Sequence, residues 1–190
     1  MNYLNDGGTF LVNAIFGLYI FCLLIRFWMH INRVDFRNPV GQFLVQISNP
    51  LLSPLKKFIS SNQGFAYAVL AIATIITVIK FTILLLMQGA TPSPLGVLVI
   101  SVADIIQSSI YIFIGAVLIN IISSWIAPQG GYNPFLAIVR ALSEPIMTPA
   151  RRLIPAFGGL DLSPILVMIF LQLSLIIIVQ PIFDLGSQLL

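Results

Sequence analysis

Charged side chains are scarce in this sequence. Aspartate, glutamate, lysine and arginine together make up 8% of the 190 residues, whereas 58% of the residues are hydrophobic. A soluble domain averages about 25% charged residues, so this chain cannot cover a water-facing surface. The composition therefore excludes an ordinary soluble domain and indicates a membrane protein.

Cysteine and histidine occur only once each, as Cys22 and His30. A single cysteine excludes a disulfide framework within the chain, and no CxxCH motif for covalent haem attachment is present. The sequence also lacks a nucleophile–base pair, a phosphate-binding loop, a GxGxxG motif and a carboxylate pair at metal-ligand spacing. We therefore expect no catalytic residues, no metal site, no cofactor and no enzyme activity.

Four apolar runs are long enough to cross a bilayer, which takes about 20 helical residues. They cover Thr9 to Ile31, Gly64 to Met87, Leu95 to Ala127 and Leu162 to Ile182. The third run would be about 50 Å long as a helix, so it must tilt, kink or begin at the membrane surface. The segment Gln88 to Pro94 contains two prolines and a glycine, which predicts a turn between the second and third spans.

The cations gather on one side of these spans. Eight of the nine lie at the end of the first span or in the loops that follow the first and third spans: Arg26, Arg33, Arg37, Lys56, Lys57, Arg140, Arg151 and Arg152. The positive-inside rule places these loops in the cytoplasm and both termini on the periplasmic side. Because the cations lie beside apolar spans, we expect anionic lipid headgroups rather than nucleic acid as their partners.

Two cytoplasmic segments repeat the same pattern 95 residues apart. When residues 38–60 are aligned with residues 133–155, six of the 23 positions are identical, including Ser48/Ser143. The repeat motif consists of Asn38, Pro39, Pro50 and Pro54 in the first copy, and of Asn133, Pro134, Pro145 and Pro149 in the second. The chain thus builds a unit of span, cytoplasmic segment and span twice, and the two copies are parallel.

Each repeated segment has one apolar face at helical spacing. This face comprises Val40, Phe43, Leu44, Ile47 and Leu51 in the first copy, and Phe135, Ile138, Val139, Leu142 and Ile146 in the second. The motif asparagines suit the N-cap and the prolines after them the first turn, whereas Pro50 and Pro145 should end the helix. About 10 helical residues are too few to span, so each segment lies at the interface or dips in as a re-entrant hairpin.

Two dibasic pairs, Lys56-Lys57 and Arg151-Arg152, stand where the chain re-enters the membrane. They either fix the span ends at the headgroups or form a specific site for an anionic lipid or a partner protein. Asp161 is expected to pair with Arg151 or Arg152. Ser163 and Pro164 are predicted as the N-cap and first residue of the last span.

Two charges remain inside the spans, Lys80 and Asp104. They stand at similar distances on either side of the outer turn, so we expect them to form an ion pair within the membrane. The two charges form a structural bridge, reach outward separately to the headgroups, or belong to an ion or proton path together with Gln107, Ser108 and Ser109.

These motifs resemble the YggT family, also called YlmG. The resemblance rests on "PLLSPLKK" (Pro50 to Lys57), "PIMTPARRLIPAFGGLDLSP" (Pro145 to Pro164), "LLIRFWMHI" (Leu23 to Ile31) and "DFRNP" (Asp35 to Pro39), and it covers nearly the whole chain. The resemblance implies a small bacterial inner-membrane protein. It links the chain to osmotic-stress tolerance, potassium homeostasis or cell division, and it carries over no catalytic residue.

The expected fold is an all-α membrane protein with four transmembrane helices, arranged as two parallel helix–interfacial segment–helix repeats. The first repeat covers residues 1–90 with the segment 38–60, and the second covers residues 91–190 with the segment 133–156. The favoured function is a membrane assembly or scaffold factor, which contacts lipid headgroups and another membrane protein or further copies of itself. The alternative is a component of a channel or transporter for potassium or another ion.

Overall fold

The computed structural model describes residues 3–56, 62–126, 133–153 and 161–190 of the chain. The four helical segments long and apolar enough to cross a membrane confirm the predicted spans. They are α1 (Tyr3–Ile31), α3 (Asn62–Met87), α4 (Pro94–Ile126) and a last span that joins α6 (Ser163–Ser174), the π-helical stretch η1 (Leu175–Val179) and α7 (Gln180–Gln188). Two shorter helices, α2 (Pro39–Lys56) and α5 (Pro134–Leu153), each connect two spans.

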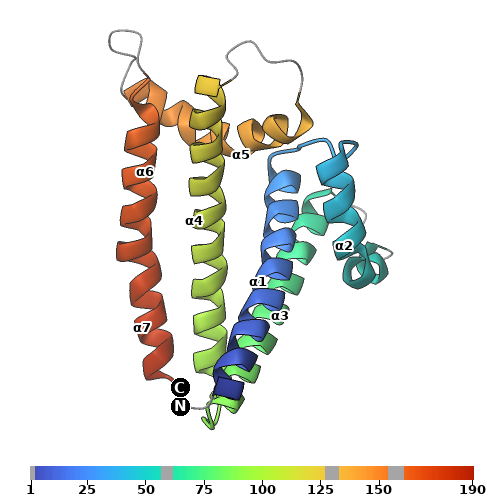
Figure 1. Ribbon diagram of the computed structural model, residues 1–190, viewed down its shortest axis with the longest axis vertical. Helices are drawn as coiled ribbons and strands as arrows, with labels where there is room; N and C mark the ends of the chain where they lie inside the picture. Colours follow the sequence, from blue (N-terminus) through green and yellow to red (C-terminus); the bar gives the residue numbers. More distant parts are fainter. Residues whose placement is uncertain (1–2, 57–61, 127–132, 154–160) are drawn as a thin grey trace.

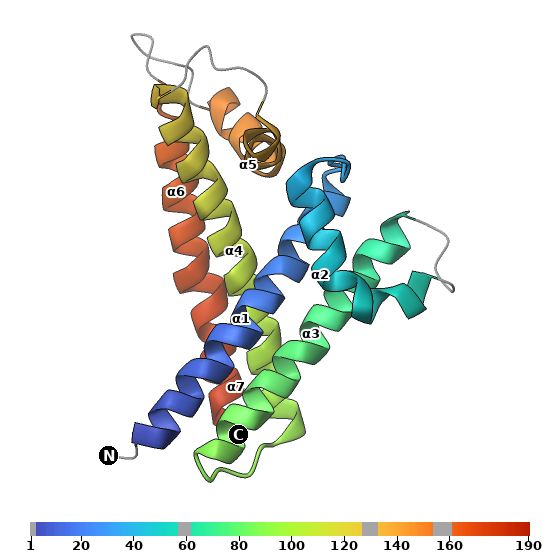
Figure 2. The same ribbon diagram turned by 45° about the vertical axis from the view of Figure 1, so that its right-hand side comes forward.

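The spans form a bundle that has the chain termini at one end and the short helices at the other. Both termini lie at one end, and α2 and α5 lie at the other, where α5 runs across the tops of the spans (Figure 1). The pair α1 and α3 diverges from the pair α4 and α6 toward the α2–α5 end (Figure 2). An even number of spans brings the chain back to the side where it started, so one face of the membrane receives both termini.

Each short helix packs in the same way within its own half of the chain. Helix α2 contacts the two spans on either side of it, α1 and α3, and helix α5 contacts α4 and α6. The two halves then join through contacts of α3 and α1 with α4. The shared packing pattern supports the parallel repeat that the sequence predicted.

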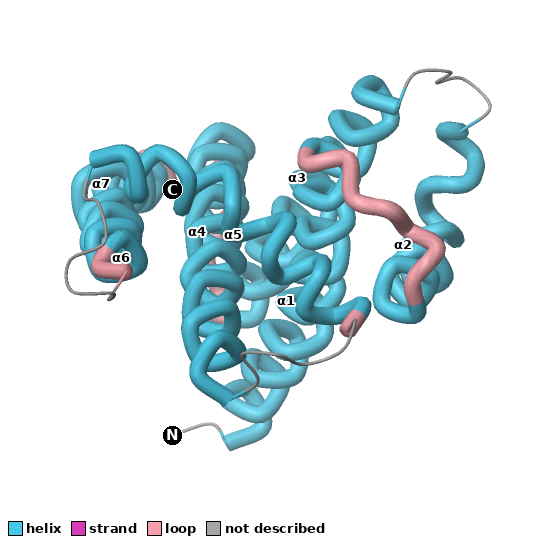
Figure 3. Tube along the Cα trace, turned by 90° about the horizontal axis from the view of Figure 1, so that it is seen from above, coloured by secondary structure: helices cyan, strands magenta, loops and turns pink. Residues whose placement is uncertain are grey.

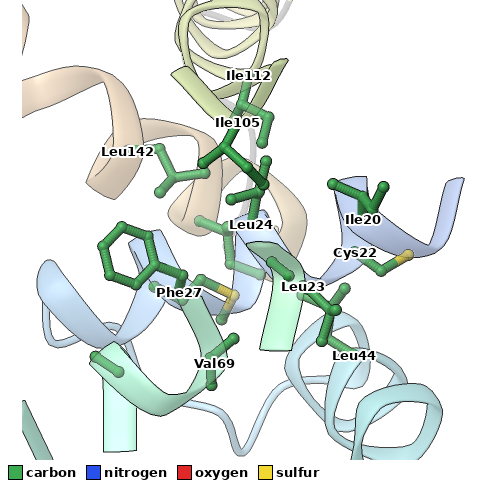
Figure 4. Close-up of a cluster of buried hydrophobic side chains, with 14 of the residues drawn as sticks. Ile20, Cys22, Leu23, Leu24, Phe27, Leu44, Val69, Ile105, Ile112 and Leu142 are labelled. Carbon is green, nitrogen blue, oxygen red and sulfur yellow. The ribbon is translucent and has the colours of Figure 1, made fainter. Parts of the chain in front are cut away.

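Two apolar clusters fill the bundle, and α5 contributes to both. The first cluster gathers residues of α1, α2, α3 and α4 around Leu24 and Phe27, and Leu142 of α5 joins it (Figure 4). The second cluster combines α4 with the last span and includes Met147 and Ala150, which lie further along α5. Helix α5 therefore ties the second repeat to the first as well as to its own spans.

The spans differ from the sequence prediction mainly at their ends. The third span was expected to tilt, to kink or to begin as a surface segment, and it is one continuous helix of 33 residues, α4, without a separate surface segment. The last span continues past Ile182 to Gln188, because the π-helical stretch η1 precedes Pro181, which lacks a backbone N–H. Close packing holds its end in place: a Cβ on Gly186 would lie 2.6 Å from the Ile100 side chain of α4.

Candidate functional site

The two short helices begin with the asparagine caps that the sequence predicted. Helix α2 starts at Pro39 and α5 at Pro134, so both prolines stand at the first helical position. The Asn38 side-chain oxygen accepts a hydrogen bond from the Gly41 N–H at 2.7 Å, and that of Asn133 accepts one from the Phe135 N–H at 2.9 Å. Each cap satisfies a backbone donor that the helix leaves unpaired.

The prediction that Pro50 and Pro145 end these helices is wrong. Helix α2 continues through Pro50 and Pro54 to Lys56, and α5 continues through Pro145 and Pro149 to Leu153. All four prolines are exposed, and their spacing of four residues puts each pair on one face of its helix. Water or headgroups can therefore satisfy the carbonyls that the prolines free, so the helix bends rather than stops, as the ribbon of α2 shows (Figure 2).

The buried faces of α2 and α5 also differ from the predicted apolar faces. Leu44 is buried as expected, but Phe43 and Leu51 are 56% and 46% exposed in the isolated chain. Ile138, Val139 and Leu142 are buried in α5, whereas Phe135 is 45% exposed. Serine takes part in the buried face of both helices, at Ser48 and at Ser143, and Leu52 is buried beside Leu44 in α2.

These two serines connect each short helix to the first span of its own repeat. Both are completely buried and are identical in the aligned repeats. The Ser48 hydroxyl accepts a hydrogen bond from the Arg26 guanidinium of α1 and donates one to the Leu44 carbonyl. The Ser143 hydroxyl accepts a hydrogen bond from the Asn120 side-chain amide of α4 at 3.2 Å and donates one to the Arg140 carbonyl at 3.3 Å. The same link therefore exists twice, with a cation as donor in one repeat and a neutral amide in the other.

Arg26 is the most deeply buried cation among the described residues, at 2% exposure. Its guanidinium contacts the Ser48 hydroxyl, lies 3.5 Å from the Asn49 side-chain oxygen, and stands 5.2 Å from the centre of the Phe65 ring. None of the ion pairs within the described part of the chain involves Arg26. Neutral oxygens and an aromatic face are the neighbours of this charge, and its buried Nε finds no hydrogen-bond acceptor among the described residues. The Ser48 hydroxyl is therefore an important acceptor.

Sequence reasoning missed the role of Arg26 and the two serines. It treated Arg26 as one of eight topology-setting cations and Ser48 and Ser143 as repeat identities. The available signals were a cation inside an apolar run and a serine retained at the same position of both repeats. Neither signal identifies the hydrogen-bond partner, because Arg26 and Asn120 lie 22 and 23 residues before their serines, on another helix.

The second dibasic pair splits into two different environments. Arg151 binds two carboxylates, with its Nη1 2.7 Å from Glu144 Oε1 and its Nε 3.0 Å from Asp161 Oδ2. Arg152 is exposed and takes part in none of the ion pairs found among the described residues. The expected pairing of Asp161 with a dibasic arginine is therefore present, and it leaves Arg152 as the cation open to other partners. Lys57 and the side chain of Lys56 lie outside what the structure describes.

Asp161 also organises the start of the last span. Its Oδ1 accepts a hydrogen bond from the Ser163 N–H at 2.9 Å. Burial works to raise the pKa of Asp161, but hydrogen bonds from Ser163 and Arg151 outweigh it and hold the pKa below the ordinary value. The predicted N-cap is shifted by one residue: Ser163 is the first helical residue and Leu162 occupies the cap position.

Lys80 and Asp104 form the expected ion pair inside the bundle. The Lys80 Nζ lies 2.7 Å from Asp104 Oδ2, and the two side chains are 7% and 16% exposed. The Lys80 ammonium also stands 4.4 Å from the centre of the Phe81 ring. The pair joins α3 of the first repeat to α4 of the second, so it fastens the two halves to each other within the membrane.

Two hydroxyl groups one turn before these charged residues donate hydrogen bonds within their own helices. The Thr77 and Ser101 hydroxyls are fully buried and donate to the Ala73 and Val97 carbonyls, one turn earlier. Among the described residues, no three histidine, cysteine, aspartate or glutamate side chains lie close enough together to hold a metal ion. The Lys80–Asp104 pair can therefore stabilise the packing of α3 against α4, and among the described residues it is the one ion pair within the spans.

Proteobacterial proteins are similar to this chain over most of their length. A protein of Vibrio alginolyticus is 33% identical over 168 residues, covering 87% of this chain and 90% of the relative. A protein of Pseudomonas aeruginosa is 34% identical over 172 residues, covering 90% and 87%, respectively. The YggT protein of Escherichia coli K12 is 29% identical over 182 residues, covering 96% and 94%. All three are described as uncharacterized, and no solved structure matches the chain significantly.

The family assignment follows from the sequence profile of the CCB3/YggT family. The profile matches the chain twice, over residues 6–87 and over residues 99–182. Each match contains two spans and the short helix between them. The repeat, the four spans and the relatives agree, and the chain therefore belongs to the CCB3/YggT family of multi-pass membrane proteins.

Proposed function

We propose that the protein is a membrane scaffold or assembly factor that holds lipid headgroups and a partner protein at the α2–α5 end of the bundle. The observation that carries this proposal is the mixed chemistry of the exposed surface there. Exposed cations at this end include Arg33, Arg37, Arg140, Arg151 and Arg152. Exposed apolar side chains beside them include Phe43, Leu51, Phe135 and Leu153. Helices of this kind lie in the interface, with apolar groups in the acyl boundary and cations at phosphates.

Arg152 is the proposed main contact for an anionic group. Arg151 already satisfies two carboxylates, whereas Arg152 lines an open hollow together with Asn32 and Pro149. A guanidinium binds phosphate or carboxylate through paired hydrogen bonds, which a lysine reproduces poorly. One cation near an anionic surface contributes about 1 kcal/mol to binding. Arg152 would therefore strengthen membrane binding by the whole of α5 and would not cause that binding alone.

A groove between α4, α5 and α6 offers a second lipid contact. It has a volume of about 710 Å³ and carries Arg151 and Asp161 among its polar lining. Apolar side chains form much of the remaining wall, including Leu118, Ile122 and Ile165. A phospholipid acyl chain lying along this wall would couple lipid binding to the position of α5.

We further propose that the protein resides in the bacterial inner membrane with the α2–α5 end in the cytoplasm and both termini in the periplasm. The cation distribution supports this orientation, since Lys80 is the one cation outside that end in the sequence. The family resemblance connects such a protein with osmotic-stress tolerance or with envelope and division processes. A scaffold at the cytoplasmic face could serve either role.

Lipid retention during purification tests the scaffold proposal. The full chain is extracted from membranes, and the bound phospholipids are quantified for the unchanged protein, for Arg152→Gln and for Asp184→Asn, a control that removes an exposed charge at the opposite end of the bundle. We expect Arg152→Gln to lose anionic phospholipid while inserting normally, and Asp184→Asn to retain it. Equal retention by all three proteins would contradict the role given to α5.

The ion pair within the membrane supports a second candidate, a channel or transporter component. Charges inside a span often mark an ion or proton path. The purified protein reconstituted in liposomes provides the test, with potassium and proton flux measured for the unchanged chain and for Asp104→Asn. Flux that depends on Asp104 would favour the channel. We expect no such flux, because the Lys80 ammonium and the Asp104 carboxylate already satisfy each other at 2.7 Å.

A further inference from the structure

One side chain in the last span is poorly suited to a lipid neighbour. Gln172 is an exposed residue of α6, nine positions after the helix begins at Ser163. At 1.5 Å per residue, Gln172 lies about 13 Å along the span, close to the middle of a hydrocarbon core about 30 Å thick. A glutamine side chain is too short to reach either headgroup region from that depth.

The Gln172 amide finds no hydrogen bond within the described protomer. Asn13, an exposed amide of α1, shows the usual solution, since its Nδ2 donates to the Thr9 carbonyl of its own helix at 3.1 Å. An amide left without a partner in hydrocarbon is strongly unfavourable, because lipid tails offer neither donor nor acceptor. Gln172 therefore requires a polar group from outside the protomer.

The last span, which carries Gln172, is the least buried of the four. Only 17% of the apolar window of the last span is buried, compared with 22% to 33% for the others. Helices α6 and α7 lie at the margin of the bundle beside α4, and their outer side carries no other helix (Figure 3). Ile169 and Ile176, three residues before and four residues after Gln172, are 53% and 65% exposed on the same side.

The π-helical stretch brings a second glutamine into line with the first. Leu171, which precedes η1, and Val179, the last residue of η1, are both buried against the bundle and mark the inner face of the span. Gln172 and Gln180 each follow one of these buried residues directly, so both amides project from the same side of the span. In a regular α-helix, side chains eight positions apart point in directions that differ by about 80° around the helix axis. The extra residue of a π turn removes most of this angular difference.

We propose that the α6–α7 face is the interface between two copies of this chain, with Gln172 of one copy hydrogen bonded to Gln172 of the other. All copies insert with the same orientation, so a residue meets its own counterpart at the same depth across a twofold axis. A glutamine amide both donates and accepts, which makes the pair self-complementary. Amide pairs of this kind hold transmembrane helices together.

Disulfide cross-linking in liposomes tests the interface. A single cysteine replaces Ile169 in a Cys22→Ala background, which leaves Gln172 intact, and Phe170→Cys serves as the control. Phe170 is 66% exposed at the same depth but projects from a different side of α6. We expect a dimer from Ile169→Cys and little from Phe170→Cys. Equal yields from the two positions would overturn the proposal.

The role of the amide is tested by measuring dimer yield against protein density in the bilayer. Gln172→Leu should lower the association constant by about tenfold, as expected for two symmetric interhelical hydrogen bonds. Its thermal stability as a monomer should not fall, because Gln172 has no partner within the protomer. Asn13→Leu, the matched change of a satisfied amide, should leave association unchanged. An association constant that Gln172→Leu does not alter would refute the pairing.

Discussion

Replacing Ser48 and Ser143 by alanine should have unequal effects on stability, although the two serines occupy the same position of the two repeats. Both hydroxyls are completely buried, and each donates to a carbonyl of its own helix. The difference lies in the group that donates to them. Arg26 is a permanent cation at 2% exposure, whereas Asn120 is a neutral amide.

The magnitudes follow from the charge of the donor. A hydrogen bond to a charged group contributes about 1.5–3 kcal/mol, and a neutral one contributes about 0.5–1.5 kcal/mol. Ser48→Ala also leaves Arg26 with only the long Asn49 contact and the Phe65 ring, since no carboxylate of the described residues pairs with it. We therefore expect a loss of about 2 kcal/mol for Ser48→Ala and of about 0.7 kcal/mol for Ser143→Ala.

Thermal unfolding in a mild detergent measures the difference. A change of 1 kcal/mol shifts the melting temperature by about 2–4 °C in a protein of this size, so Ser48→Ala should melt about 4–8 °C lower than the unchanged chain. The bond that each serine makes to its own helix is lost in both variants and cancels in the comparison. Equal shifts, or a larger shift for Ser143→Ala, would refute the claim that the buried guanidinium depends on Ser48.

Three further changes test other contacts. Lys80→Met alone should cost about 3 kcal/mol of unfolding free energy, because it leaves the Asp104 carboxylate without its partner. Adding Asp104→Leu should recover part of that loss. A double variant no more stable than Lys80→Met would show that the pair is unimportant. Asp161→Asn should lower the melting temperature at neutral pH but not in acid. Because the pKa of Asp161 is lowered in the folded state, its contribution to stability is present above the ordinary aspartate pKa range. That contribution is lost as the pH falls through the lowered pKa. A persistent difference in acid would contradict this linkage. Single cysteines at Asp35 and Gln188 should label from opposite sides of the membrane, with Gln188 reached from the periplasm; the reverse pattern would invert the proposed orientation.

The protein class, the spans and the repeat were predictable from composition and local pattern. A chain with 8% charged residues and four long apolar runs has few ways to fold other than by crossing a membrane with helices, because backbone groups in hydrocarbon must be satisfied within the helix. The caps at Asn38 and Asn133 were equally predictable, since capping is a local interaction between residues two or three positions apart. The pairing of Lys80 with Asp104 followed from the high cost of an isolated charge in the membrane.

Two features of the short helices depend on packing with other helices: which side of each helix is buried, and that each helix continues beyond its prolines. Local rules end a helix before Pro50 and Pro145, but both helices continue because the proline faces point away from the bundle, where freed carbonyls can meet water. Local periodicity assigned Phe43 and Leu51 to the buried face, yet both are exposed, whereas Ser48 is buried and accepts a hydrogen bond from Arg26 of another helix. Contacts between residues distant in sequence depend on how the helices pack, and apolar spacing along one helix carries no information about them.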